Sequence, residues 1–558
     1  MSSIPSARPR PIRWVVALLV TVAMLVGTTG VAVFAQNGST GGPAFAPASS
    51  VAWAELRLDL PGDQEEQLGQ LLGHLPGFAD PAALDAKVNE LLDQVVSQAS
   101  SGAATWTGNV DPWSNRQFGL ALLEIPASTT VVDDNDDNDD NDDDDSVNQD
   151  DPAMVIGLGV KDRTALEAQL STLLTQDDIS TESYAGATVT TVDDDASYAV
   201  TDDYLLVAPH AADVKAALDV LAGTAPGLAQ DAGYAAAAQR IPANRLGAVY
   251  FALSTLRPFL EAQLTGQPGA EAALDMLDQL PAWVSGYAQA SSDHLTLAFD
   301  MQTPASLPVP SMRATDLAAH FPADTLVYLE TRDLGRTAHA VLEAVMAQVP
   351  EEDAQQLAQI EQLLGSPLEE FLDPVEDAAL GIGATGGQPQ VGLAATLSDP
   401  ATAQTRATSL LALVRLAGAR SGLTATESEV AGTTVTTIAL PSDTTAFGSP
   451  VTISVAVADD RLYLGLGDFV ADALTQDASA SLASTPRFQI ALAEGGSPNA
   501  GLVFVDLAGA QSLFESMGGA DEDYQTNVKP WLDTLDYLVV SSAADQDTLS
   551  TKALLYVR

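Results

Sequence analysis

One stretch of the chain occurs twice, and this duplication limits the fold more than any other feature of the sequence. Residues 185–192 read AGATVTTV, and residues 431–438 read AGTTVTTI. Each copy leads into a second matching piece, AVTDDYLL at 199–206 and AVADDRLY at 456–463. Short β-branched runs separated by small or acidic residues are typical of β-hairpins. We therefore interpret the chain as a tandem duplication.

The matching pieces define two repeats, residues 47–302 and 317–558, joined by a proline-rich linker at 303–316. Asp162 and Asp399 stand at corresponding helix starts, where a carboxylate can cap the helix. Runs of strands interrupted by helices, with tight hairpins, are typical of the α+β class. We expect two tandem homologous halves, each a largely antiparallel sheet covered by helices, after one N-terminal transmembrane helix.

The N-terminal region predicts export. Residues 1–13 are polar and contain Arg8, Arg10 and Arg13, and the uncharged run Trp14–Ala35 follows. As a helix this run is about 33 Å long, which is enough to cross a bilayer. The basic flank predicts a single-pass anchor in the cell membrane, with residues 1–13 in the cytoplasm and the body extracytoplasmic.

The alternative is a signal peptide cleaved between Ala35 and Gln36, which would make the protein secreted. Residues 36–46 are predicted to form a flexible linker in either case.

The composition excludes several kinds of partner and chemistry. The net charge is −52, from 23 basic and 75 acidic residues. A surface of this charge repels nucleic acid and anionic lipid headgroups. Because the chain contains no cysteine, disulfides, thiolate metal sites and cysteine nucleophiles are excluded.

An acidic insertion, residues 127–151, occurs in the first repeat and not in the second. Its carboxylates suit hard cations such as Ca²⁺, but the insertion lacks the glycine and the bidentate glutamate of an EF-hand loop. We expect a disordered loop with no preformed metal site and weak, diffuse Ca²⁺ binding. The candidate cation ligands are Asp133, Asp134, Asp136, Asp137, Asp139, Asp140, Asp142, Asp143, Asp144 and Asp145.

The order of the pieces resembles an uncharacterised bacterial family, the domain of unknown function 3352. The resemblance rests on DPW at 111–113, GLGVKD at 157–162, YAG at 184–186, YAVTDD at 198–203, VAG at 430–432 and ASTPRF at 483–488. It implies an exported or anchored bacterial protein without an assigned activity. No catalytic residue follows from it.

Catalytic motifs are absent from the sequence: it contains no zincin, phosphate-loop, nucleophile-elbow or dinucleotide signature. The histidines, His74, His210, His294, His320 and His339, have no ligand-type spacing. The tryptophans Trp53, Trp106, Trp113, Trp283 and Trp531 are predicted to lie in the core.

We therefore predict a non-catalytic binding or scaffold protein, without a cofactor, that is held at the membrane only by its N-terminal helix. Its partner would be a protein or a cell-envelope component. The alternatives are a cell-envelope hydrolase whose site forms only in three dimensions, and a carrier of an apolar ligand. The ligand and the oligomeric state do not follow from the sequence.

The aspartate insertion generates a first prediction. Since the second repeat closes the equivalent connection with a few residues, deletion of Asp133–Asp145 should leave the melting temperature nearly unchanged in calcium-free buffer. Calcium titration of the intact chain should give a dissociation constant no tighter than about 10⁻⁴ M, and salt should weaken the binding. A submicromolar affinity, or loss of folding on deletion, would contradict this interpretation.

Overall fold

The computed structural model describes residues 42–124, 152–255, 280–346, 361–440 and 451–558, together with residues 261 and 274. Shorter gaps within these ranges fall at 79–83, 101, 175–178, 194–195, 305–308, 363, 369, 386–387, 419–423 and 517–520. The chain divides into two compact units, Met1–Ser306 and Leu307–Arg558. The predicted anchor, most of the predicted linker at 36–46 and the aspartate insertion lie outside the described residues.

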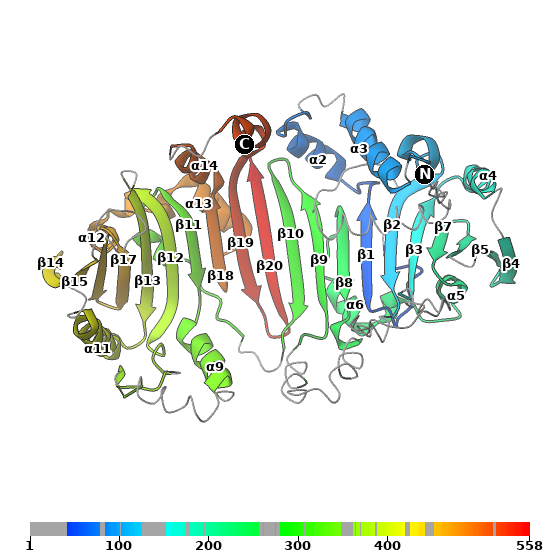
Figure 1. The fold of residues 1–558 in the computed structure, drawn as a ribbon. Coiled ribbons are helices and arrows are strands. Elements are labelled where there is room, and N and C mark those ends of the chain that lie inside the picture. Colours follow the sequence, from blue (N-terminus) through cyan, green and yellow to red (C-terminus); the bar gives the residue numbers. More distant parts are fainter. Residues whose placement is uncertain are drawn as a thin grey trace, which may run out of the picture. The chain divides into compact units, whose positions relative to one another are not determined.

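In the first unit the strands pair antiparallel throughout the described sheet (Figure 1). In spatial order they are β4 (Ile179–Tyr184), β5 (Ala187–Val192), β6 (Ala196–Val200), β7 (Tyr204–Ala208), β3 (Met154–Val160), β2 (Ser114–Leu122), β1 (Ala52–Arg57), β8 (Gly247–Phe251), β9 (Val284–Ala290) and β10 (His294–Gln302). This arrangement confirms the prediction of an α+β protein built on antiparallel sheet.

The second unit has the same order of strands. They are β14 (Thr424–Val430), β15 (Thr433–Leu440), β16 (Val451–Ala458), β17 (Arg461–Leu466), β13 (Gln388–Leu397), β12 (Val375–Thr385), β11 (Thr325–Thr331), β18 (Gly501–Asp506), β19 (Leu535–Ala544) and β20 (Thr548–Val557).

The duplicated stretch forms the same hairpin in each unit. Ala185 and Gly186 connect β4 to β5 with positive φ angles of 48° and 83°, and Ala431 and Gly432 connect β14 to β15 with 49° and 80°. Two consecutive residues with positive φ define a type I′ turn, whose twist matches that of the paired strands. The geometry of the type I′ turn therefore explains why a glycine, which adopts positive φ without strain, follows the alanine in both copies.

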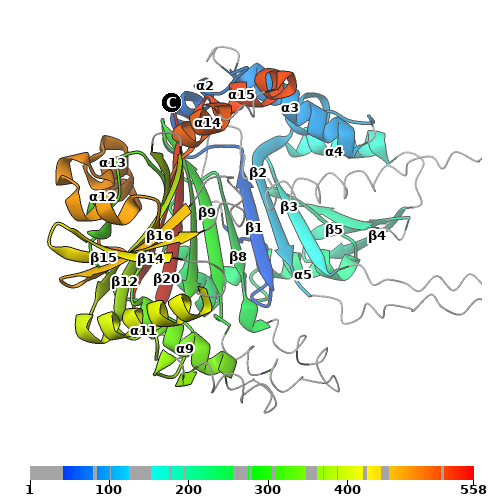
Figure 2. The ribbon, with the colours of Figure 1, turned by 60° about the vertical axis from the view of Figure 1, so that its left-hand side comes forward.

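Helices cover one face of each sheet. In the first unit α5 (Ala211–Leu221) and α6 (Ala232–Ala238) pack there, and Phe45 and Ala46, at the end of the predicted linker, are buried in the same core. In the second unit α12 (Phe469–Thr475), α13 (Pro486–Gly495) and the short helix η4 (Leu317–His320) take this place (Figure 2).

The remaining helices lie at the margins and on the opposite face. In the first unit they are α2 (Gln64–Gly73), α3 (Leu84–Ala99), η2 (Trp106–Val110) and α4 (Arg163–Leu173). In the second they are α9 (Leu334–Met346), α11 (Pro400–Gly418), α14 (Leu507–Ser516), η8 (Tyr524–Val528) and α15 (Lys529–Leu532). The predicted caps are confirmed: Asp162 accepts from the amide of Ala165, and Asp399 from that of Thr402, each at 3.0 Å.

Glycines in the second unit make room for aromatic rings. Gly381, Gly392 and Gly465 lie opposite one another on β12, β13 and β17. A Cβ at Gly381 would lie 2.2 Å from Cδ1 of Phe321, and one at Gly392 would lie 2.2 Å from Cδ2 of Phe469. The rings lie directly on the backbone, so side chains there would push them out of the core.

This contact generates a prediction about stability. Gly381→Ala should lower the free energy of unfolding by about 1–3 kcal/mol, since the new methyl overlaps the ring of Phe321. Gly383→Ala is the matched control on the same strand and face, because its Cβ would meet only backbone at 3.4 Å. Urea denaturation of both variants measures the difference, and equal midpoints would show that the ring adjusts without cost.

Candidate ligand-binding face

Opposite the helix-covered core, the second sheet carries two rows of aliphatic side chains. Residues paired across neighbouring strands make up each row, and no member of either row is polar. The first row is Val455, Leu464, Leu393, Leu380, Leu329, Val503, Val540 and Ala553. The second is Ile453, Leu466, Val391, Ile382, Val327, Val505, Leu538 and Leu555. We call these two rows the aliphatic face.

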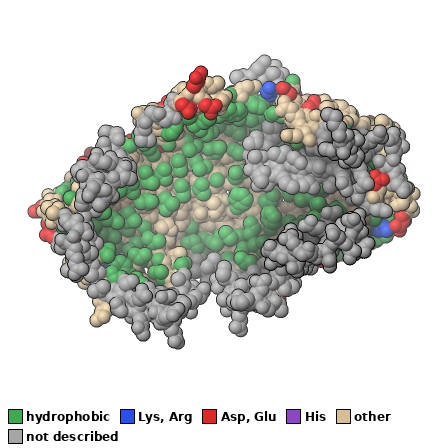
Figure 3. All heavy atoms as spheres, viewed as in Figure 1, with side chains coloured by type: hydrophobic (Ala, Val, Ile, Leu, Met, Phe, Trp, Pro, Cys, Tyr) green, Lys and Arg blue, Asp and Glu red, His purple; other side chains and the backbone are tan. Residues whose placement is uncertain are grey.

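The centre of the aliphatic face is exposed. Leu329, Leu380, Ile382 and Leu464 keep 42%, 37%, 40% and 39% of their surface accessible. Figure 3 shows hydrophobic side chains gathered over the strands of this unit, on the side that Figure 1 presents to the viewer. Soluble proteins seldom leave a continuous apolar surface in water, and such surfaces usually mark binding sites.

Three central strands direct large aliphatic side chains away from the core because of their alternating sequences. β12 contains Ala379, Leu380, Gly381 and Ile382 in succession, and β13 alternates in the same way. β17 does so at 464–466, whereas its Tyr463 is buried in the core. Glycine and alanine face the core, where they admit rings from the helices, and leucine, isoleucine and valine face outward. This alternation is the sequence signal from which the outward-facing aliphatic side chains could have been predicted.

Helices border the aliphatic face without covering its centre. Leu334 of α9 and Ala403 of α11 pack with Ala378 and Ala395, which lie on β12 and β13 beside the first row. Helix α14 packs on β19 and β11. The exposed centre therefore lies between helical margins within the second unit.

The corresponding face of the first unit is more completely covered. Trp106, Trp113 and Leu166 pack over Ile156 and Leu158. Large exposed side chains remain on this unit's β8 and β10, at Phe251 and Phe299. The tryptophans of the first unit thus take up surface that the second unit leaves open.

The prediction for the tryptophans is correct at four positions and wrong at one. Trp53, Trp106, Trp113 and Trp283 are buried. Trp531 is exposed, because the short helix α15 directs it outward from the sheet. An aromatic residue on a marginal helix lacks the cross-strand neighbours that bury one in a sheet.

Four of the five histidines have local partners. His210 lies 3.6 Å from Asp213, His294 2.8 Å from Asp293 and His339 2.9 Å from Asp373, and His320 contacts the hydroxyl of Tyr463 at 3.1 Å. His74 ends α2 and is exposed. Within the described ranges no three histidine, aspartate or glutamate side chains form a group that could hold a metal ion.

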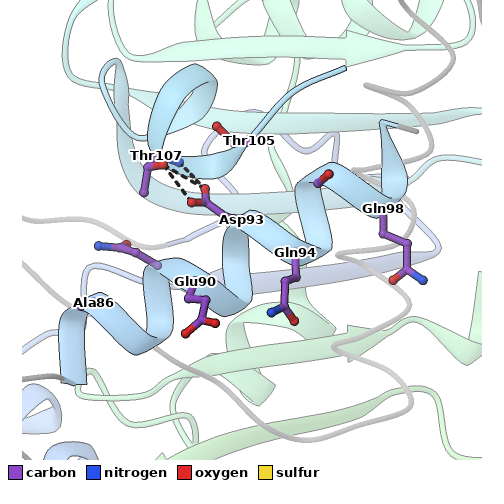
Figure 4. Close-up of a pocket in the computed structure, with 9 residues that line it drawn as sticks. Ala86, Glu90, Asp93, Gln94, Gln98, Thr105 and Thr107 are labelled. Carbon is purple, nitrogen blue, oxygen red and sulfur yellow. Dashed lines mark hydrogen bonds between the residues drawn. The ribbon is translucent and has the colours of Figure 1, made fainter. Parts of the chain in front are cut away.

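A polar hollow of about 800 Å³ runs along α3 in the first unit (Figure 4). Asn89, Glu90, Asp93 and Gln94 are among its lining residues. Asp93 accepts hydrogen bonds from the amide of Thr107 at 2.8 Å and from its hydroxyl at 2.9 Å. Since this carboxylate joins α3 to η2, the hollow has a structural explanation.

Buried charges hold the second unit together near one end of β11. Arg332, which is fully buried, binds Glu330 and lies 3.4 Å from Asp377, and Asp377 also binds Arg313 at 2.6 Å. Arg313 belongs to the predicted linker, so part of that linker is fastened to the second unit. Burial raises the pKa of Glu330, although the nearby Arg332 lowers it.

In the first unit, the buried carboxylate of the first strand is paired with a different arginine. Glu55 of β1 is buried and binds Arg245, which precedes β8, whereas Arg57 binds Asp59 at 2.6 Å. The sequence analysis did not identify these charge pairs, because nothing in the sequence distinguishes a buried carboxylate among so many acidic residues.

Comparisons with known proteins identify the family. The chain belongs to the family described as "Protein of unknown function (DUF3352)", which matches residues 14–556. The resemblance in the sequence is thereby confirmed. A search of curated proteins gives no match.

Two solved structures show a remote likeness. Crystal form III of TP0453 has 8% identity and a TM-score of 0.24, over 49% of this chain and 83% of that one. Crystal form IV has 15% identity and a TM-score of 0.21, over 44% and 81%. At these TM-scores the likeness says nothing about the function of this chain.

The buried glutamate generates a prediction for pH dependence. A raised pKa means that folded Glu330 holds its proton more tightly than the unfolded chain does. Its contribution to stability is therefore fully present below the ordinary pKa near 4.5 and is lost as the pH rises through the folded pKa. The unfolding free energy of the native chain minus that of Glu330→Gln should fall over this window.

Denaturation at a series of pH values measures this difference, with exposed Glu429→Gln on β14 as the matched comparison. A difference that rises with pH would show that Arg332 outweighs burial.

Proposed function

We propose that this protein is a non-catalytic, extracytoplasmic binding protein, and that its ligand is a hydrocarbon chain held against the aliphatic face. The observation that carries the proposal is the pair of rows from which polar side chains are absent. An aliphatic surface of this kind offers dispersion and burial but no hydrogen bonds from its side chains, which suits a ligand part that needs none.

The dimensions fit an extended chain. At about 4.8 Å between neighbouring strands, a row that crosses eight strands is about 34 Å long. Each methylene moved from water onto such a surface contributes about 0.8 kcal/mol when fully buried. A ligand that follows a row can therefore gain affinity from its length.

The charge disfavours other occupants. Two copies of a chain with a net charge of −52 repel each other, so a second copy is a poor partner for this face. Protein interfaces also concentrate aromatic and arginine side chains at their centre, and this centre has neither. A lipid with an uncharged or zwitterionic head avoids the repulsion.

The location that we propose gives access to lipid. The N-terminal sequence favours a single-pass anchor or a cleaved signal peptide, and the body is extracytoplasmic in both cases. Within the described part of the chain, no helix is long and apolar enough to cross a membrane. We further propose that the two units descend from one duplicated α+β domain, supported by their shared strand order.

Photocrosslinking tests the proposal on the full chain in membranes. Phosphatidylcholine with a diazirine in its acyl chain should label peptides that contain Leu329, Leu380, Ile382 or Leu464. Ile382→Gln should reduce this labelling at least fivefold, because an amide in the second row must be desolvated without a partner.

The control is Ile490→Gln on α13, which replaces an isoleucine that is 49% exposed, against 40% for Ile382, on the opposite side of the same sheet. Thermal unfolding of both variants verifies that they fold. Labelling confined to residues 14–35, or equal loss in both variants, would refute the proposal.

A further inference from the structure

A second apolar surface lies on the helices that follow β18. Phe514 of α14, Val528 at the end of η8 and Trp531 of α15 are 42%, 41% and 49% exposed. Val528 and Trp531 are three residues apart in continuous helical backbone, so they share one side of it. We call these three residues the aromatic corner.

Hydrogen bonds and ion pairs hold the aromatic corner in shape. The rings of Phe514 and Tyr524 are 5.3 Å apart, and the hydroxyl of Tyr524 donates to Glu515 at 2.9 Å. Lys529 binds Glu515 at 2.7 Å and Asp533 at 3.0 Å. The lysine between the exposed apolar residues is thus neutralised by carboxylates of its own unit.

These residue types suit the boundary between headgroups and acyl chains. Tryptophan has a large apolar ring system with a polar N–H, and it is enriched at that boundary in membrane proteins. Phenylalanine and valine add apolar area that a bilayer can cover.

The charges around the corner select the type of bilayer. Asp521, Glu522 and Asp523 are exposed close by in the chain, and Lys529 is paired. Anionic headgroups would be repelled by this surface, as would a second copy of the chain. Uncharged or zwitterionic headgroups would not.

The helix that carries Phe514 packs on two strands of the aliphatic face. Helix α14 packs on β11 and β19, the strands that contribute Leu329 and Val540 to the face, and α15 packs beside α14. Figure 2 shows α14 and α15 together. The aromatic corner and the aliphatic face are therefore joined through α14 and the strands on which it packs.

We infer that the aromatic corner inserts into the interface of a bilayer with neutral headgroups and is the place where a lipid chain passes onto the aliphatic face. It is a membrane contact additional to the predicted anchor. The membrane contact does not depend on the proposed function, whereas the passage of a lipid chain onto the aliphatic face rests on the proposed function.

Fluorescence of the full chain in vesicles tests the contact. In phosphatidylcholine vesicles with bromine on the acyl chains, Trp531 should be quenched relative to unbrominated vesicles. Subtracting the fluorescence of the Trp531→Phe variant from that of the native chain isolates the Trp531 signal, because Trp14 of the predicted anchor contributes equally to both proteins. A Trp531 emission that is the same in both vesicles would overturn the inference.

A charged substitution in the aromatic corner gives a second test of the membrane contact. Val528→Asp should at least halve the quenching of Trp531, and Ile490→Asp on α13 should leave it unchanged. Phosphatidylglycerol vesicles should quench less than phosphatidylcholine vesicles at low salt. Stronger quenching by the anionic lipid would overturn the choice of a neutral surface.

Photocrosslinking in the same vesicles separates the two proposals. Quenching without labelling of the aliphatic face supports the membrane contact and refutes the proposed ligand. Labelling of the face without quenching refutes the aromatic corner and leaves the ligand supported.

Discussion

The second unit depends on the fit between flat backbone and aromatic rings. Phe321 and Phe469 lie on Gly381 and Gly392, at positions where any β-carbon would overlap them. Because successive residues of a strand point to opposite faces, glycine toward the core leaves the intervening leucine and isoleucine to face outward. The core and the aliphatic face are thus two sides of one sequence pattern.

Both units contain a buried carboxylate on their first strand, and the arginine that pairs with it differs between the two units. Glu55 and Glu330 occupy similar positions on the first strand of each unit, yet Arg245 binds the former and Arg332 the latter. An unpaired buried carboxylate is costly, so each must keep a cation. The structure shows that the position of the carboxylate is retained while the origin of its partner changes.

Differences in covering helices explain why, among the described residues, the second unit presents a more open aliphatic centre than the first. In the first unit, Trp106 and Trp113 cover part of the sheet. In the second unit, the corresponding part of the sheet stays exposed. Under the proposed duplication and the proposed function, one copy serves stability and the other serves binding. The proposed membrane contact also belongs to the second unit, because the aromatic corner lies on the exposed sides of its helices α14, η8 and α15.

The sequence alone determined the repeated stretches, the α+β class, the hairpins and the helix caps, because turns, caps and alternation depend on neighbouring residues. It also indicated the family. It did not reveal the aliphatic face, since outward leucines on β12 become recognisable only when β11, β13 and β17 lie beside them and the helices occupy the other side. Trp531 was assigned to the core for the same reason: burial depends on what packs against a side chain. The tertiary structure decided which apolar residues remain in contact with water, and with them the candidate site, because this choice depends on contacts between segments far apart in the chain.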